Sequence, residues 1–104
     1  MNKDIKSEMK ARIRMQFRKL EEAGKPVPPH NHQGLINYIV DHIAPGSFLT
    51  NVLCNDLKAA CVSADWPNAY NMWNVVNFLY NHAPIQCWGD REKFNKWIAD
   101  GNND

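Results

Sequence analysis

The spacing of apolar residues near the start of the chain predicts one long amphipathic helix. Over residues 1–24, apolar side chains recur four, four, four and three positions apart, at Ile5, Met9, Ile13, Phe17 and Leu20. This spacing places them on one narrow seam of a helix that is otherwise charged. Gly24 is a favourable helix stop, and the Pro-rich residues 25–30 form an extended linker. We therefore expect this linker to separate the charged helix from a helical body at residues 31–100.

The pattern in residues 31–100 predicts four helices and no strand. They cover about residues 32–43, 48–63, 66–82 and 91–99, with helix-stopping or helix-capping residues between them. Ser47 and Asp65 are suitable N-caps for the second and third of these helices. The predicted fold is all-α: a compact four-helix body preceded by a long charged N-terminal helix on a Pro-rich linker.

A carboxylate interrupts the apolar face of the predicted helix at residues 48–63. At about 100° per residue, Asp56 falls within one apolar stripe, formed by Leu49, Val52, Leu53, Leu57 and Ala60. A buried carboxylate is costly unless it is paired. Two explanations stay open. Either the fold supplies a partner, through a helix cap, His42 or a Trp indole N–H, or Asp56 binds a ligand at the floor of a pocket.

The predicted helix at residues 66–82 lies in a stretch without formal charge. From Trp66 through Gly89 the chain has no Lys, Arg, Asp or Glu. The expected inward face consists of Ala69, Met72, Trp73, Val76, Leu79 and Tyr80, and the opposite, amide face carries Asn71, Asn74, Asn77 and Asn81 with Tyr70 and Phe78. A solvated helix face normally carries charge. We therefore expect the amide face to pack on the N-terminal helix or a second copy, or to bind a protein or a base-like ligand.

Charge is distributed unevenly along a chain whose net charge is +1. Residues 1–25 carry eight basic and four acidic groups, whereas residues 26–104 carry four basic and seven acidic groups. Basic clusters are typical of nucleic-acid contact, for which the candidates are Arg12, Arg14, Arg18 and Lys19. The charges at both ends of this helix oppose its dipole. Its stability should therefore depend on burial of the seam from Ile5 to Leu20, against the body or in a homo-oligomer.

The residue types that carry chemistry form no recognisable catalytic or metal-binding pattern. The run His30-Asn31-His32 lacks a matched Cys/His pair at zinc-finger spacing, and we expect it at a helix start. No glycine-rich phosphate loop, Ser/His/Asp set or inward pair of carboxylates is present. The sequence therefore predicts a protein that is not an enzyme and that uses no cofactor or metal.

The cysteines and the hydropathy pattern predict a cytoplasmic protein. Cys54 and Cys61 are too far apart on one predicted helix for a disulfide, and with Cys87 they are expected to be small buried apolar groups or inert thiols. No apolar run is long enough to span a membrane. The charged N-terminus lacks the apolar core of a signal peptide.

Several short motifs follow one another along the body. They are Pro45-Gly46-Ser47-Phe48-Leu49, Val52-Leu53, Asn55-Asp56-Leu57, Ala64-Asp65, Asn68, and Pro84 through Cys87-Trp88-Gly89 to Trp97. This string, over about residues 30–99, resembles a family of small uncharacterised proteins encoded by bacteriophages and prophages. The resemblance implies a protein that acts by binding: it blocks a host or defence protein, sequesters a nucleotide signal or regulates transcription. Trp88 then joins Asp56 as a candidate binding residue, although Trp88-Gly89-Asp90 also suits a packed turn that opens the last helix.

These observations together predict a non-enzymatic phage accessory protein in the bacterial cytoplasm. It is expected to bind a host or defence protein, and a homo-oligomer is possible through the N-terminal seam. Two alternatives stay open. One is a nucleic-acid-binding regulator that uses the basic N-terminal helix, and the other is a small nucleotide-binding sponge centred on Asp56.

Overall fold

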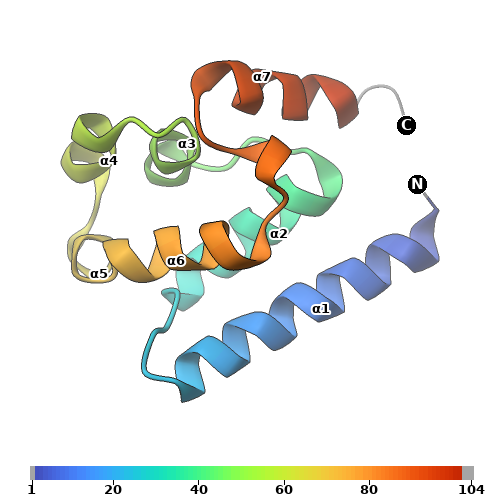
Figure 1. The fold of residues 1–104 in the computed structure, drawn as a ribbon, viewed down its shortest axis with the longest axis horizontal. Helices are drawn as coiled ribbons and strands as arrows, with labels where there is room; N and C mark the ends of the chain where they lie inside the picture. The colour runs from blue at the N-terminus through green and yellow to red at the C-terminus, as the bar shows by residue number, and fades with distance from the viewer. Residues whose placement is uncertain (1, 102–104) are drawn as a thin grey trace.

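All regular structure in the computed structural model, which describes residues 2–101, is helical (Figure 1). The α-helices of that range are α1 (Lys3–Glu22), α2 (His32–Asp41), α3 (Ser47–Leu53), α4 (Leu57–Ser63), α5 (Trp66–Tyr70), α6 (Met72–His82) and α7 (Arg91–Asp100), and two 3₁₀ turns are η1 (Pro29–Asn31) and η2 (Ile85–Cys87). The all-α prediction is confirmed. The body described by the structure has six α-helices and not the four predicted, because the two longer predicted body helices are each divided in two.

The N-terminal helix α1 packs along the body (Figure 1). It begins where the Asn2 side chain accepts a hydrogen bond from the backbone N–H of Ile5 (2.9 Å). Phe17 is buried, with its ring 4.0 Å from the ring of His32 and 4.7 Å from that of Phe78. The chain therefore covers most of the apolar seam itself, and only Ile5 is left 46 % exposed. A homo-oligomer through the seam would have that one end available to it.

The Pro-rich segment after α1 is anchored to the body. Gly24 ends α1 as predicted, with a left-handed backbone (φ 77°). The N–H of the next residue, Lys25, donates a hydrogen bond to Leu20 O (2.8 Å). Val27 is buried, and its carbonyl accepts a hydrogen bond from the His32 ring (2.8 Å). As a result, α1 and the body share one hydrophobic core.

Helix α7 is fixed to the end of α2 by polar contacts of two aromatic rings. Trp97 Nε1 donates to Tyr38 O (2.8 Å), and His42 Nδ1 donates to Trp97 O (2.6 Å). A Cβ added to Gly101 would lie 2.6 Å from the Cβ of His42, so this close approach of the α7 end requires glycine. Two groups that were possible partners of Asp56, the imidazole and an indole, are therefore used here.

One of the two predicted N-caps is found and the other is displaced by one residue. The Asp65 carboxylate accepts the backbone N–H of Asn68 (2.9 Å) at the start of α5. Ser47, in contrast, is the first residue of α3, and the N-cap is Gly46, which has no side chain to accept a hydrogen bond. Both positions still mark the beginning of a helix, as the sequence predicts.

Candidate functional site

The second predicted body helix is broken after Leu53. Asn55 has a left-handed backbone (φ 57°), and its N–H bonds to Val52 O (2.9 Å). The N–H of Asp56 bonds to Asn51 O (2.9 Å). These two hydrogen bonds form a Schellman motif, which ends α3.

The same junction gives Asp56 its structural role. Its carboxylate accepts the backbone N–H of Ala59 (3.1 Å), so Asp56 is the N-cap of α4. The expectation of a carboxylate on a buried helix face is therefore wrong. Asp56 is exposed, because the chain changes direction one residue before it. Of the partners considered from the sequence, the helix cap is the one observed.

Helix α6 turns a different face to the core from the one expected. Its buried side chains are Val75, Phe78 and Leu79. Trp73 and Tyr80, expected inside, are 62 % and 79 % exposed, and Val76 is 37 % exposed. Phe78, expected outside, is buried because α1 places a phenylalanine ring against it. The docking of α1 thus decides which face of α6 is internal.

The asparagines of the amide face bond along their own helices. Asn74 Nδ2 donates to Asn71 Oδ1, and Asn81 Nδ2 donates to Asn77 Oδ1, each with a donor–acceptor distance of 2.8 Å. Asn71 Nδ2 in turn donates to Pro67 O (2.8 Å). These bonds use part of the hydrogen-bonding capacity of the amides without a second element. Of the amide face, Phe78 packs against Phe17 of α1, whereas these asparagines bond to groups of α5, α6 and the junction between them.

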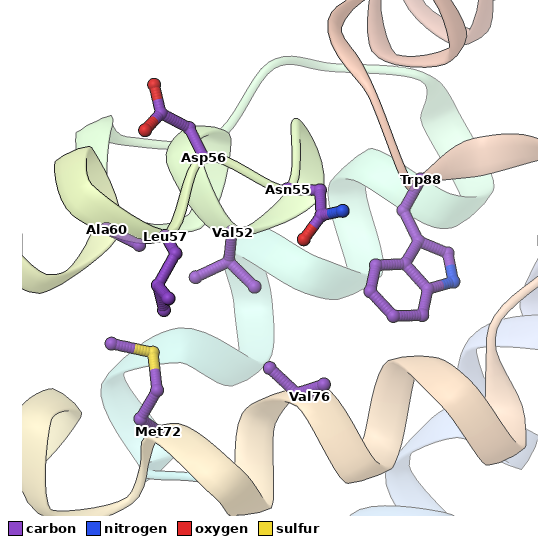
Figure 2. Close-up of a pocket in the computed structure, with 8 residues that line it drawn as sticks. All are labelled: Val52, Asn55, Asp56, Leu57, Ala60, Met72, Val76 and Trp88. Carbon is purple, nitrogen blue, oxygen red and sulfur yellow. The ribbon is translucent and has the colours of Figure 1, made fainter.

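An open apolar groove lies between α4 and α6, with Trp88 at one end (Figure 2). It is lined by Val52, Asn55, Asp56, Leu57, Ala60, Met72, Val76 and Trp88, and its volume is about 70 Å³. In Figure 2 the Leu57 side chain points toward Met72, whereas the Asp56 carboxylate points away from the groove. The structure thus brings two predicted site residues, Asp56 and Trp88, to one groove. Asp56 lies at its rim and not at its floor.

A larger hollow of about 620 Å³ lies next to the groove and is also bordered by Trp88. Its lining consists of Asn55, Val76, Tyr80, Ala83, Ile85, Trp88, Gly89 and Lys93. Asn55, Val76 and Trp88 border both spaces, so the two lie next to each other; the groove is here called the narrow end of the site and the hollow its wide end. Lys93 brings a positive charge to the wide end, and the narrow end is apolar apart from Asn55 and the rim carboxylate.

Trp88 is positioned by the turn that opens α7. Gly89, with φ 127°, donates its N–H to Leu53 O (2.8 Å), which ties the turn to the end of α3. The Asp90 carboxylate accepts the N–H of Lys93 (2.7 Å) and caps α7. The packed turn predicted from the sequence is confirmed, and it holds the half-buried indole at the groove.

Four large aromatic side chains on α5 and α6 are exposed. Trp66, Tyr70, Trp73 and Tyr80 have 75 %, 77 %, 62 % and 79 % of their surface accessible. The Trp66 and Tyr70 rings lie 6.1 Å apart, and Lys25 Nζ is 5.7 Å from the centroid of the Trp73 ring. The sequence interpretation identified Tyr70 as outward and missed the other three. The available signal was the recurrence of aromatic residues at intervals of four, three and seven.

The basic residues expected to contact nucleic acid are exposed but divided between two flanks of α1. Arg14 and Arg18 line a hollow on one side of Phe17. Arg12 borders a separate hollow, and Lys19, seven residues later, shares its side of the helix. The four residues therefore do not form one basic patch.

The histidine run and the cysteines have structural surroundings. His30 Nε2 lies 3.3 Å from an Asp65 carboxylate oxygen, and the run spans η1 and the start of α2, as predicted. Cys54 and Cys87 are buried, and burial raises the pKa of the Cys87 thiol to about 12. Cys61 is exposed, so for this residue the expectation of a buried apolar group is wrong. Within residues 2–101, no three His, Cys, Asp or Glu side chains are grouped to hold a metal ion.

No family model, curated protein or solved structure matches the chain. Across residues 2–101, none of the helices has both the length and the apolar character needed to cross a bilayer. The groove and the exposed aromatic residues are therefore the features on which a functional proposal can rest.

Proposed function

We propose that the protein is a non-enzymatic phage accessory protein that acts in the cytoplasm of its bacterial host by binding a host or defence protein. The proposed binding site is the groove between α4 and α6. The observation that carries the proposal is an open apolar depression, into whose narrow end no charged side chain points. Protein partners place their strongest anchors in such pockets, as large apolar or aromatic side chains.

The chemistry of the groove favours an apolar side chain over a nucleotide. The narrow end, of about 70 Å³, offers aliphatic contacts from Leu57, Met72 and Val76. A phosphate would need cationic groups or a cradle of backbone N–H donors. The charged residue at the narrow end is Asp56, which is acidic, and its carboxylate points outward. We infer a partner segment with one large apolar residue for the narrow end and an acidic residue close to it in sequence that can reach Lys93 at the wide end.

A charge at Leu57 tests this site with little risk to the fold. Leu57 is 71 % exposed and is the first residue of α4, where an acidic side chain interacts favourably with the helix dipole. The full chain first captures a partner from host extract, and the purified partner is then titrated calorimetrically. We expect Leu57→Asp to bind at least about 10-fold more weakly than wild type, because a desolvated, unpaired carboxylate costs more than about 1.4 kcal/mol.

Val62→Asp is the matched control for this experiment. Val62 lies on the same helix, is 80 % exposed and is not part of the groove lining. Its affinity for the partner should stay within about 2-fold of wild type, as for surface changes outside an interface. Equal affinity for wild type and Leu57→Asp, or an equal loss in both variants, would exclude the groove as the binding site.

A further inference from the structure

The exposed aromatic residues of α5 and α6 follow the spacing of a helix–helix seam. Trp66, Tyr70, Trp73, Asn77 and Tyr80, here called the aromatic stripe, are four, three, four and three residues apart. Alternating intervals of four and three place side chains on one side of a helix, toward a second helix. Two backbone hydrogen bonds of helical spacing, each 3.0 Å, bridge the junction between α5 and α6 at Asn71. The stripe is therefore continued across that junction.

The exposed area of the stripe is close to what a stable dimer needs. A large aromatic side chain offers about 150–250 Å², so the four rings, at 62–79 % exposure, present roughly 450–700 Å². Val76 and Ile85, which are 37 % and 73 % exposed, enlarge this surface. A standard protein interface buries about 800 Å² on each partner, and typical monomers rarely leave a larger apolar patch than about 300–600 Å².

The charge of the stripe favours a second copy of this chain as its partner. In a two-fold symmetric dimer the same surface meets itself, so any charged residue near the axis faces its own copy and repels it. No residue of the stripe carries a formal charge, and neither does any other residue from 66 to 89. A surface selected for a foreign protein would gain partner choice and association rate from complementary charges. The stripe residues themselves have none to offer, and a charge beside them is that of Lys25, whose Nζ lies 5.7 Å from the centroid of the Trp73 ring.

Asn77 is suited to the centre of such a dimer. It lies in the middle of α6, and its Oδ1 accepts a hydrogen bond from Asn81 Nδ2. Within residues 2–101 its own Nδ2 donates to no acceptor, so one donor group is available for a partner. An amide both donates and accepts, and so it can pair with its own copy. A single asparagine in an apolar helix seam is also a known device for fixing register and oligomeric state.

We propose that two copies of the chain associate through the aromatic stripe, with Asn77 of one copy beside Asn77 of the other. This inference goes beyond the proposed function, although Tyr80 belongs both to the stripe and to the wide end of the site. Leu57 and Asn77 each belong to one surface alone, so Leu57→Asp tests partner binding and the charge exchange at position 77 tests self-association.

Charge exchange at position 77 tests the dimer. The mass of the full chain is measured by sedimentation equilibrium at concentrations up to about 1 mM. Wild type should reach twice its monomer mass of 12.0 kDa. Asn77→Asp alone and Asn77→Lys alone should each stay at the monomer mass, because like charges meet at the axis. An equimolar mixture of the two variants should recover the dimer mass, since opposite charges then face each other.

Three further variants keep the test decisive. Asn95→Asp and Asn95→Lys, on the exposed side of α7, are the matched controls and should keep the mass of wild type. Tyr80→Ala, at a side chain that is 79 % exposed, should weaken dimerisation at least 10-fold with unchanged helical circular dichroism. A wild type that stays at 12.0 kDa throughout would overturn the proposal. So would single Asn77 variants that remain dimeric, or a mixture that does not associate.

Discussion

Helices α1 and α6 show that the charge of a helix does not determine how much of it is exposed. α1 belongs to the most charged part of the chain, yet it buries Ile13 and Phe17 and covers the body along its length. α6 carries no Lys, Arg, Asp or Glu, yet Trp73 and Tyr80 are largely exposed. From its charge α1 would be expected to lie in solvent, yet it is packed on the body. From its lack of charge α6 would be expected to be buried, yet one of its sides is exposed.

The difference follows from how apolar residues are distributed around each helix. In α1 they form one narrow seam, and a single contact with the body is enough to cover it. In α6 they occupy two sides, with Val75, Phe78 and Leu79 on the inner one and Trp73, Val76 and Tyr80 on the outer one. A helix at the edge of a small body can turn only one side to the core. The second side is therefore left exposed.

Truncation of one aromatic ring on each helix gives the largest expected contrast. Phe17→Ala should lower the free energy of unfolding by about 3–5 kcal/mol, because it leaves a cavity between α1 and α6. Tyr80→Ala should change it by less than about 0.5 kcal/mol, as expected for an exposed site. Urea denaturation at low protein concentration, which avoids a contribution from association, measures both. Similar losses for the two variants would show that α1 does not cover the core as described.

The cap of α4, which forms the wall of the groove opposite α6, gives a smaller expected effect. Asp56→Ala should destabilise the protein by about 1 kcal/mol through loss of the N-cap hydrogen bond to Ala59. Asp56→Asn should retain most of this stability, because asparagine is an equally good N-cap. Thermal denaturation distinguishes the two. If Asp56→Asn were as unstable as Asp56→Ala, the carboxylate charge would have a role beyond capping.

The ends of the helices were more predictable from the sequence than the side that each helix turns to the core. Gly24, Asp65 and Asp90 act locally, since each satisfies backbone groups within a few residues of itself, and each lies at the helix end that its residue type predicts. The break at Asn55 is local too. It was hidden because the apolar periodicity continues through it from Leu53 to Ala60.

The orientation of α6 could not be derived from its own residues. Both of its sides offer apolar side chains, so periodicity alone allows either one to face the core. The choice depends on α1, whose Phe17 packs against Phe78 from a distant part of the chain. The groove depends on a similar long-range contact, because the Gly89 N–H to Leu53 O hydrogen bond places Trp88 beside α3 and α4. Tertiary contacts of this kind leave no local pattern.

The ion pairs that fasten α1 to α2 should make the docking of α1 modestly sensitive to pH. Lys10 Nζ and Lys6 Nζ lie 3.0 and 3.4 Å from the Asp41 carboxylate. The hydrogen bond from Lys10, with a smaller contribution from Lys6, lowers the pKa of Asp41 below its usual value of 3.8.

Because the folded-state pKa of Asp41 is depressed, this contribution is complete above the unfolded-state pKa and is lost as the pH falls through the folded-state value. The groups are partly exposed, so the contribution should not exceed about 1 kcal/mol. Asp41→Asn should therefore lower stability slightly at pH 7 and make the acid limb of the stability curve shallower, as measured by urea denaturation between about pH 2 and 7. An acid limb unchanged by Asp41→Asn would mean that these ion pairs contribute nothing measurable to the docking of α1.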